Sequence, residues 1–285
     1  MIKLTQIGWN YALSNKLSTS QLDDIARQLQ RDVKIDLPTS ADPYNFGKEV
    51  ARLARLALIA DELGIADARA NALANIEAAL LPWLNQENSD PFVYDKTYGG
   101  VVPLIGLVNQ FGDFGAGWYS DHHFHYGYFV YVAAVISRLD ASFADAHRTM
   151  FDVFLRDYCN PDTSDADFPF ARHKDFYDGH SWASGLLIQA NGKGQESSSE
   201  AVNAYYGAYL YAQQTNNVDL MHFSHLMLAM EVQASLTYWH MPQDTDIYDP
   251  IFAANRMAGM DRISIFFSFV FILTLHRSFR RYIYR

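Results

Sequence analysis

Cysteine is almost absent from this chain of 285 residues, in which Cys159 is the only one. A single cysteine excludes an internal disulfide framework, and no pair of cysteines suggests a structural zinc site. The redox compartment therefore stays open. Positive charge is also scarce, because 22 Lys and Arg stand against 32 Asp and Glu and give a net charge of −10. That sign is wrong for binding a polyanion, so we do not expect nucleic acid as a partner.

Several short motifs are missing as well. The first ten residues, MIKLTQIGWN, lack the basic cluster and the apolar stretch of a secretory signal. The chain as written has no signal peptide, which fits either a cytosolic protein or a piece of a longer exported one. No Asn-x-Ser/Thr acceptor occurs, which weakens a glycosylated extracellular interpretation without removing it. A Gly-x-x-x-x-Gly-Lys phosphate loop and a Gly-x-Ser-x-Gly serine elbow are absent too, which disfavours phosphoryl transfer and serine-based acyl transfer.

One uncharged apolar run, ISIFFSFVFILTL, occupies residues 263–275. A helix needs about 17–20 such residues to cross a bilayer, so this run does not support a confident membrane association. Three interpretations stay open: a weak tail anchor, a buried final helix, and a sequence that has left its natural reading frame. We favour the third, for a reason given below.

The residues that are abundant indicate a large folded core. Hydrophobic residues make up 49% and aromatic residues 15% of the chain, which excludes a disordered tail, a collagen-like fibre and a linker. Apolar residues recur at helical spacing through most of the chain, and almost nothing alternates with the period of a strand. The caps and periodicity predict helices after Ser20 and over residues 43–63, 66–81, 123–139, 143–157, 181–189, 197–213 and 220–238.

Two long segments between the predicted helices are rich in glycine, proline and aromatic residues. They cover residues 85–119 and 160–179, and they carry more ionisable groups than the other connections. This asymmetry predicts an all-α helical toroid whose long loops form one working face. An ordinary helical bundle or solenoid is the alternative, but the sequence has no fixed-period repeat of the tetratricopeptide or armadillo kind.

Histidines crowd into the middle of the chain, where six of the ten lie between Asp121 and His180. The densest piece, DHHFHYG at 121–127, begins at the entry to a predicted helix, and Asp121 could simply cap that helix. His122 and His125 could share a helix face and hold a metal with Asp121. No His-Glu-x-x-His pattern and no third ligand can be identified, so we predict neither a metal nor another cofactor.

A pair of carboxylates offers a second kind of chemistry. Glu196 and Glu200 in GQESSSE are four residues apart at a helix start, where side chains at this spacing are neighbours. The positive helix end favours the ionised form of Glu196 and suits a general base. The same two acids could merely complement the helix dipole. Aromatic residues nearby could stack on sugar rings, and acids with aromatic platforms fit glycoside hydrolysis better than phosphoryl or acyl transfer.

Three strings, in this order and at these intervals, resemble glycoside hydrolase family 81, the endo-β-1,3-glucanases. They are DHHFHYGYFVYVAAVI, FARHKDFYDGHSWASG and GQESSSEAVNAYYG. DPYNFGKEVARLARLALIADELG and VYDKTYGGVVP are similar to earlier parts of the same pattern, so that the resemblance spans about residues 17–260. It implies a catalytic (α/α)6 toroid that cleaves internal β-1,3-glucosidic bonds in β-1,3-glucan with inversion at the anomeric carbon.

The resemblance also implies the roles of three acids. Asp121 matches the general acid of the family and Glu196 its general base, while Glu200 supports Glu196 or helps to hold the water. To act as an acid near neutral pH, Asp121 must keep its proton, so we expect burial or neighbouring acids to raise its pKa. An inverting pair needs carboxyl groups about 6.5–9.5 Å apart, whereas about 5 Å would favour retention.

Further residues follow from the same resemblance as candidates for substrate binding, although for each single aromatic a place in the core is at least as well supported. His123, His125, Asp178 and His180 could bind sugar hydroxyls or tune the acids. Trp118, Trp182, Tyr44 and Tyr205 could line glucan subsites, and Asp95 could lie at the cleft rim or cap a turn.

The chain departs from the family pattern at both ends. It begins close to the toroid without the preceding β-sandwich, and residues 261–285 resemble nothing in the pattern. We therefore expect a catalytic-domain fragment over residues 1–260, with an incomplete ring, and a divergent or aberrant tail over 261–285. The parent protein is expected outside the cell or at the cell wall. A polysaccharide lyase on the same toroid and a non-catalytic glucan-binding module stay open as alternatives, and the oligomeric state is not predicted.

Overall fold

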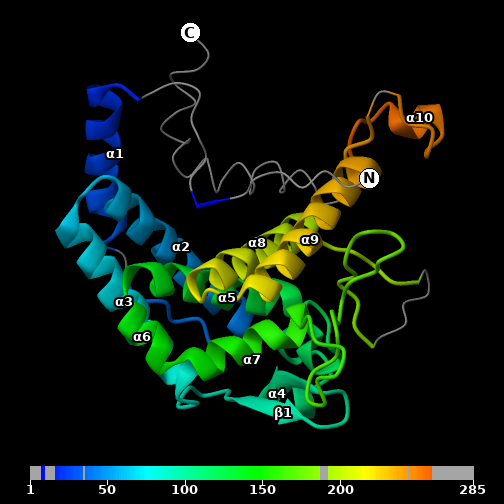
Figure 1. Ribbon diagram of the computed structural model, residues 1–285, viewed down its shortest axis with the longest axis horizontal. Coiled ribbons are helices and arrows are strands. Elements are labelled where there is room, and N and C mark those ends of the chain that lie inside the picture. Colours follow the sequence, from blue (N-terminus) through cyan, green and yellow to red (C-terminus); the bar gives the residue numbers. More distant parts are fainter. Residues whose placement is uncertain (1–7, 10–16, 35, 187–191, 243, 259–285) are drawn as a thin grey trace.

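The computed structural model describes residues 8–9, 17–34, 36–186, 192–242 and 244–258. Helices dominate these residues, which confirms the predicted all-α class (Figure 1). The complete ring of the (α/α)6 toroid stays a prediction. The apolar run at 263–275 and the tail at 261–285 lie outside the described residues.

The first helices begin at side-chain caps. Helix α1 (Thr19–Asp32) follows Ser18, whose hydroxyl accepts the N–H of Gln21 while the Gln21 side chain accepts the N–H of Ser18. The predicted cap at Ser20 was therefore wrong by two residues, because this reciprocal pair requires glutamine three positions after the cap. Helix α2 (Pro43–Glu62) begins after Asp42, as predicted, and Gly64 ends it with a left-handed φ of +67°.

Helix α3 (Ala66–Leu84) runs past the proline at which we expected it to stop. Pro82 lies in the last turns, where the missing N–H removes a single hydrogen bond from the helix. The next residue holds that turn in place, because the Trp83 ring stacks on Phe46 of α2 at 4.5 Å between centroids. Tertiary packing therefore overrides the local breaker.

Helix α5 (His122–Leu139) forms the centre of the molecule. Every residue from 122 to 136 is buried, as expected for a helix enclosed by other elements on all sides. The predicted helix over 143–157 is instead two helices, α6 (Ala141–Ala146) and α7 (Arg148–Cys159). The short helix begins early because Asp140 accepts the N–H groups of Ser142 and Phe143, and the chain then breaks at His147.

Helix α8 (Ser198–Gln214) packs directly against α5 in a parallel orientation. A Cβ atom added at Gly127 of α5 would lie 2.7 Å from the Ala204 Cβ of α8. One turn further along both helices, a Cβ added at Gly207 would lie 3.1 Å from the Tyr131 nitrogen. Because these contacts advance together along the two chains, α5 and α8 begin at the same end of the molecule.

Helix α2 shares this direction. Its Tyr44 ring contacts the His125 ring of α5 at 5.0 Å, and a Cβ added at Gly47 would lie 3.0 Å from the Tyr128 Cβ. The first turns of α2, α5 and α8 therefore lie together. Helix N-termini carry partial positive charge, so this shared end favours acidic side chains.

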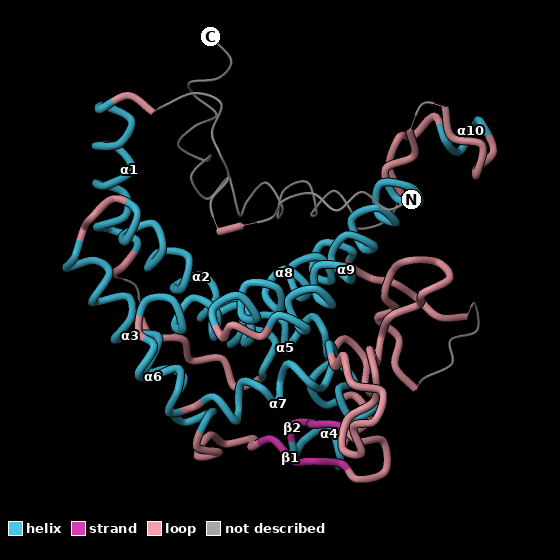
Figure 2. Tube along the Cα trace, in the orientation of Figure 1, coloured by secondary structure: helices cyan, strands magenta, loops and turns pink. Residues whose placement is uncertain are grey.

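Long loops gather at the same end, as the asymmetry of the sequence predicted (Figure 2). The first lies between α3 and α5, and a small hairpin that we did not predict interrupts it. Strand β1 (Phe92–Asp95) pairs antiparallel with β2 (Gly100–Pro103), and α4 (Leu104–Val108) and the 3₁₀ segment η1 (Gly112–Trp118) follow.

The second loop runs from α7 to α8. Lys174 and Ser181 form an isolated antiparallel bridge in it, and residues 181–186 form no helix. The predicted helix at 181–189 is therefore wrong over residues 181–186, because their polar groups are engaged with other loops and with α9; residues 187–189 lie outside the described part. Helix α9 (Val218–Ala234) continues into a π-helical turn, η2 (Ser235–Trp239), and α10 (Pro250–Ala253) follows.

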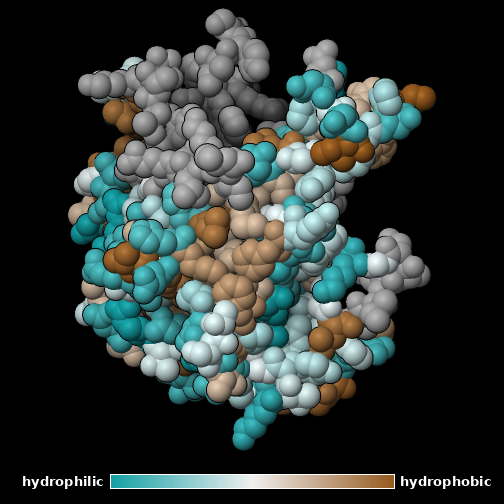
Figure 3. Space-filling model, turned by 45° about the vertical axis from the view of Figure 1, so that its right-hand side comes forward, coloured by the Kyte–Doolittle hydropathy of each residue, from teal (hydrophilic) through white to brown (hydrophobic). Residues whose placement is uncertain are grey.

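The surface carries apolar side chains at several places, which Figure 3 shows as brown atoms between hydrophilic regions. Among the exposed hydrophobic residues, Val108 ends α4 and Phe111 lies three residues later, and Leu226 and Leu236 lie on α9 and η2. In the described part of the chain, no helix combines the length and the hydropathy that a membrane span requires.

Candidate active site

Asp121 occupies the position directly before the first turn of α5, but it does not cap that helix. Its backbone is left-handed, with φ of +60°, and its side chain makes no capping hydrogen bond. The N–H of Asp121 is instead bound to the carbonyl of Ala183 at 3.0 Å in the second loop. The loop contact turns the backbone away from the ordinary cap geometry, which leaves the carboxyl group free of this structural role.

The surroundings of Asp121 favour its protonated form. Burial is the main cause that raises the pKa of Asp121 to about 7; His125 opposes the rise, and the charges of Glu196, Glu200 and Asp113 add to it. The expectation of a raised pKa from burial and flanking acids is confirmed. A carboxyl group of this kind can hold a proton near neutral pH and give it to a leaving group.

The two glutamates lie at the start of α8. Glu196 is exposed just before the helix, and Ser197 caps it by accepting the N–H of Glu200 at 3.4 Å. Glu200 is half-buried and accepts the hydroxyl proton of Tyr128 from α5 at 2.7 Å. Since both glutamates act on the pKa of Asp121, the structure brings together the three acids that the sequence nominated.

Tyr44 and His125 complete the inner part of this group. The charge of Glu200 adds to burial in raising the pKa of Tyr44 well above its ordinary value, and Lys48 donates to the Tyr44 hydroxyl at 3.2 Å. His125 lies one turn after Asp121 with its side chain 2% exposed, and its Nδ1 lies 3.1 Å from the Asp113 carboxylate. Burial alone would lower the pKa of His125, but the hydrogen bond and charge of Asp113, together with the charges of Asp121 and Glu200, outweigh burial and raise it.

Burial rules out direct substrate contact for two candidates, His123, whose alternative role was to tune the acids, and Tyr205, whose alternative was a place in the core. His123 is 0% exposed, stacked on the ring of His173 and hydrogen-bonded to the Ser181 hydroxyl. Tyr205 is 1% exposed and belongs to the hydrophobic core beside Tyr158. Neither side chain has surface that a sugar could touch, because both point into the packed interior between helices and loop.

The remaining candidates lie in or beside the loops. Trp118 is half-buried at the end of η1, where its carbonyl accepts the N–H of Leu186 at 2.7 Å. Trp182 is half-buried and donates its indole N–H to Asp175. His180 is buried against the rings of Trp182 and Trp239, and Asp178 is half-buried in the same loop. Asp95 accepts the hydroxyl proton of Tyr119 at 2.9 Å.

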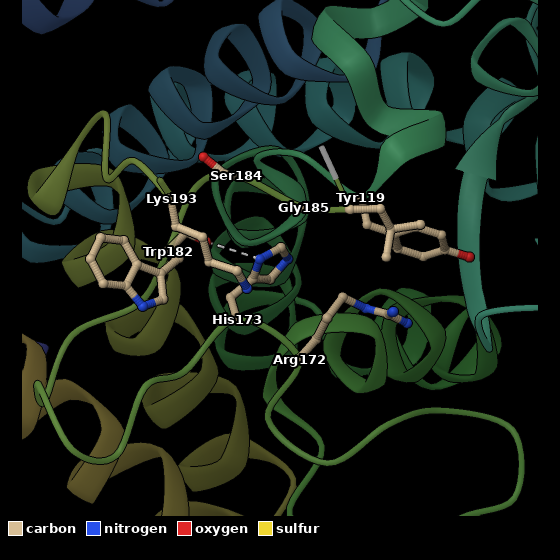
Figure 4. Close-up of a pocket in the computed structure, with 8 residues that line it drawn as sticks. Tyr119, Arg172, His173, Trp182, Ser184, Gly185 and Lys193 are labelled. Atoms are coloured by element: carbon tan, nitrogen blue, oxygen red, sulfur yellow. Dashed lines mark hydrogen bonds between the residues drawn. The ribbon is translucent and has the colours of Figure 1, made fainter. Parts of the chain in front are cut away.

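A small pocket of about 120 Å³ opens among these loops (Figure 4). Trp182 and Tyr119 lie on either side of His173, and the His173 ring is bound to the Trp182 carbonyl. Ser184 and Gly185 line the pocket and directly follow Ala183, which holds the backbone of Asp121. The pocket therefore adjoins the acidic group rather than enclosing it.

His122 is directed away from the acids. Its Nδ1 lies 2.6 Å from the buried carboxylate of Asp157 and its Nε2 lies 2.8 Å from the Ala116 carbonyl, so both ring nitrogens are engaged. A shared metal site of His122 and His125 is thus contradicted, since the second histidine faces Asp113 instead. Within the described residues, no group of three or more His, Cys, Asp or Glu side chains could hold a metal ion.

Sequence reasoning missed two residues of η1. Asp113 has a side chain that is 1% exposed, although it lies in a glycine-rich loop. Phe114 is 57% exposed, and its ring contacts Tyr44 at 5.5 Å and His125 at 6.0 Å. The motif Gly-Asp-Phe-Gly shortly before DHHFHYG was the available signal, because glycines on both sides permit a loop to turn its polar residue inward.

Comparison with known proteins agrees with this arrangement. Residues 16–268 match the family described as "Glycosyl hydrolase family 81 C-terminal domain". The glucan endo-1,3-beta-D-glucosidase of Glycine max is 34% identical over 244 residues, which are 84% of this chain and 36% of that protein. The primary septum glucan endo-1,3-beta-D-glucosidase of Schizosaccharomyces pombe is 35% identical over 221 residues, which are 76% of this chain and 22% of that protein.

Comparison with solved structures points to the same family. The glycoside hydrolase family 81 protein of Clostridium thermocellum superposes with a TM-score of 0.66 and 30% sequence identity, covering 81% of this chain and 31% of that one. The chain thus spans about a third or less of the length of these relatives. The family match covers most of the described helices and all three acids, and this chain therefore belongs to glycosyl hydrolase family 81, in its C-terminal domain.

Proposed function

We propose that this chain supplies the catalytic domain of an endo-β-1,3-glucanase, which hydrolyses internal β-1,3-glucosidic bonds with inversion. Asp121 is the general acid, Glu196 the general base, and Glu200 supports the base. The observation that carries the proposal is the raised pKa of Asp121 beside two glutamates at the shared end of α5 and α8. Relatives that are called glucan endo-1,3-beta-D-glucosidases supply the substrate class.

The acid step follows from the position of Asp121. Its protonated carboxyl group gives its proton to the glycosidic oxygen as the bond to the anomeric carbon breaks. Because the group is largely removed from water and flanked by acids, the neutral form is retained until it is needed.

The base step belongs to Glu196, which is exposed at the positive end of α8. Its carboxylate takes a proton from water, which attacks the anomeric carbon from the face opposite the leaving oxygen. This geometry requires about 6.5–9.5 Å between the carboxyl groups of Asp121 and Glu196. Glu200 is held by the Tyr128 hydroxyl and lies one turn into the helix, where its charge keeps the proton on Asp121.

The glucan chain is proposed to lie along the loop face. Tyr44, Trp118, Trp182 and the exposed Phe114 offer aromatic surfaces, and Asp178 offers a carboxylate to sugar hydroxyls. His125 and His180 act from buried positions beside these groups. A polysaccharide lyase would use a Tyr or Lys base and a basic cleft, whereas the groups gathered around Asp121 are mostly acids.

Digestion of a laminarin-type β-1,3-glucan by the full chain tests the proposal. We expect soluble oligosaccharides of several lengths, with the α-anomer formed first, as ¹H NMR of the fresh products would show. Glu196→Gln should reduce the rate at least about a hundredfold while glucan binding persists, because the amide cannot take the proton. Glu87→Gln, on an exposed residue after α3, is the matched control and should leave the rate unchanged.

The other outcomes are equally informative. Binding without any products would identify a non-catalytic glucan-binding module and overturn the enzymatic proposal. First formation of the β-anomer would overturn inversion, and undiminished turnover by Glu196→Gln would remove this residue as the base.

The proposal extends to the parent protein. We propose that it acts outside the cell or at the cell wall, since one relative is named for the primary septum. The boundary between a catalytic domain at 1–260 and a divergent tail at 261–285 is part of the same proposal. Residues 16–268 match the family, so the boundary falls within or near the end of the match.

A further inference from the structure

We propose that Asp113 is a positioning residue of this site, which holds His125 against the general acid Asp121 through a buried carboxylate–imidazole pair. The inference rests on the proposed function and adds a residue to it.

The contact itself is the first support. The Oδ2 atom of Asp113 lies 3.1 Å from Nδ1 of His125, with side chains that are 1% and 2% exposed. His125 in turn donates its backbone N–H to the carbonyl of Asp121 at 3.0 Å. This backbone bond fixes His125 one helical turn from Asp121, and the imidazole acts on the Asp121 carboxyl group through its charge.

The second support is the energetic cost of burying the Asp113 carboxylate beside His125. Its other carboxylate oxygen, Oδ1, is buried without a hydrogen-bond partner in the described part of the chain, and burying a charged group without full hydrogen bonding is unfavourable. The backbone is strained as well, because Asp113, Phe114 and Gly115 are left-handed in succession, with φ of 45°, 56° and 88°. Such strain at a non-glycine residue is unfavourable and clusters at functional sites.

The aromatic rings packed around the Asp113–His125 pair fix the imidazole near Asp121, so that its charge acts on the Asp121 carboxyl group. The Tyr44 ring lies on His125 at 5.0 Å and the Phe114 ring meets it at 6.0 Å, so the imidazole has little freedom to move. With Nδ1 held by a carboxylate, the positively charged form of His125 is favoured one turn from the acid. That charge limits how far burial raises the pKa of Asp121.

Several other ionisable groups face this pair, and the expected pH effect takes all of them into account. They are Glu196 and Glu200 at the start of α8, Tyr44 on α2, His123 on α5 and Asp90 before β1. Replacing Asp113 by Asn removes a negative charge, which by itself lowers the pKa of Asp121. It also lets His125 lose its proton, which raises the pKa of Asp121. The second effect is larger, because His125 influences Asp121 more strongly than Asp113 does.

The test is the pH dependence of kcat/KM for Asp113→Asn in the full chain, measured on a soluble β-1,3-glucan. Asparagine can still accept the hydrogen bond from His125, so the position of the ring is kept while the charge is lost. We expect the alkaline limb to move upward by about one pH unit. His125→Gln should move the limb in the same direction, and the double variant should match His125→Gln. Asp67→Asn, on an exposed residue of α3, is the control and should not move it.

A second readout separates this inference from the proposed function. Titration of histidine-labelled chain by NMR should show the pKa of His125 lowered in Asp113→Asn, whether or not the chain hydrolyses glucan. An inactive wild-type chain would overturn the proposed function alone. An unchanged His125 titration, or a lower kcat with the alkaline limb at the wild-type pH, would overturn the role of Asp113 and reduce it to a structural contact.

Discussion

At the scale of single residues, the protonation of Asp121 decides how this site can work. Its left-handed backbone and its bond to the loop carbonyl of Ala183 remove it from helix capping. Burial then raises its pKa to about 7, which is the range in which a carboxyl group serves as an acid in neutral solution. The same residue type in an ordinary cap would be ionised and useless as a proton donor.

The raised pKa predicts the alkaline limit of activity. Because the proposed acid Asp121 must be protonated to give its proton, kcat/KM should level off about one to two pH units below 7, reach half its plateau near pH 7 and fall about tenfold per pH unit well above it. A pH–rate profile of the full chain on a β-1,3-glucan measures this. A profile that stays flat to pH 9 would show that Asp121 is not the acid.

Glu200 provides a test of the coupling between the acids. Its negative charge raises the pKa of Asp121, so Glu200→Gln should lower that pKa and move the alkaline limb toward lower pH. The shift is opposite in sign to the one expected for Asp113→Asn. The midpoint of the limb is the measurement, because it is independent of any loss in the maximal rate, and an unmoved midpoint would contradict the coupling.

At the scale of elements, the parallel packing of α2, α5 and α8 brings their first turns to one place. The close approach of α5 and α8 depends on glycine at two levels, Gly127 and Gly207. Each glycine lets the partner backbone or a small side chain come nearer than a Cβ atom would allow. This approach sets the distance between the start of α5, where Asp121 lies, and the start of α8, where the glutamates lie.

Gly127→Ala tests the close approach. The added Cβ would lie 2.7 Å from the Ala204 Cβ and 2.8 Å from its Cα, so the helices must separate. We expect a loss of about 1–3 kcal/mol in the free energy of unfolding, measured with urea. Ala204→Gly in addition should restore part of the loss, since it removes one of the two contacts. A more stable Gly127→Ala variant, as helix propensity alone predicts, would contradict the packing.

At the scale of the whole molecule, a buried ion pair fastens the second loop to the helices. The Lys174 ammonium lies 2.7 Å from the Glu231 carboxylate of α9, and both side chains are 0% exposed. Glu231 also accepts the N–H and hydroxyl protons of Ser181. Since the loop between Lys174 and Ser181 carries Asp178 and His180, the pair ties part of the candidate sugar-binding face to the helical body.

Lys174→Met should be strongly destabilising, because it leaves the buried carboxylate of Glu231 without its cation. A loss of about 3–5 kcal/mol in the free energy of unfolding is expected, measured by urea denaturation at pH 7. Lys96→Met, on an exposed residue, is the control and should change little. If Lys174→Met cost no more than the control, the pair would not be buried as the structure has it.

The sequence alone determined the helical class, the start of α2 after Asp42 and the family, and it nominated the acids at 121, 196 and 200. These features depend on local chemistry: apolar spacing, a capping side chain and contiguous motifs survive in any context. The failures were also local. We predicted that α3 would stop at Pro82, that residues 181–186 would form a helix and that Ser20 would cap α1. In each case tertiary contacts or a neighbouring capping side chain outweighed the local sequence signal.

Only the tertiary structure decided which candidates share the site. Tyr205 is buried in the hydrophobic core, and His123 is covered by His173 and Ser181 of the second loop, which its neighbours in sequence do not reveal. His122 and His125 are one turn apart, yet separate carboxylates, Asp157 and Asp113, draw them to different places. Sequence spacing shows what a residue could do, whereas burial and the charges brought beside it from distant segments set its protonation and its access to substrate.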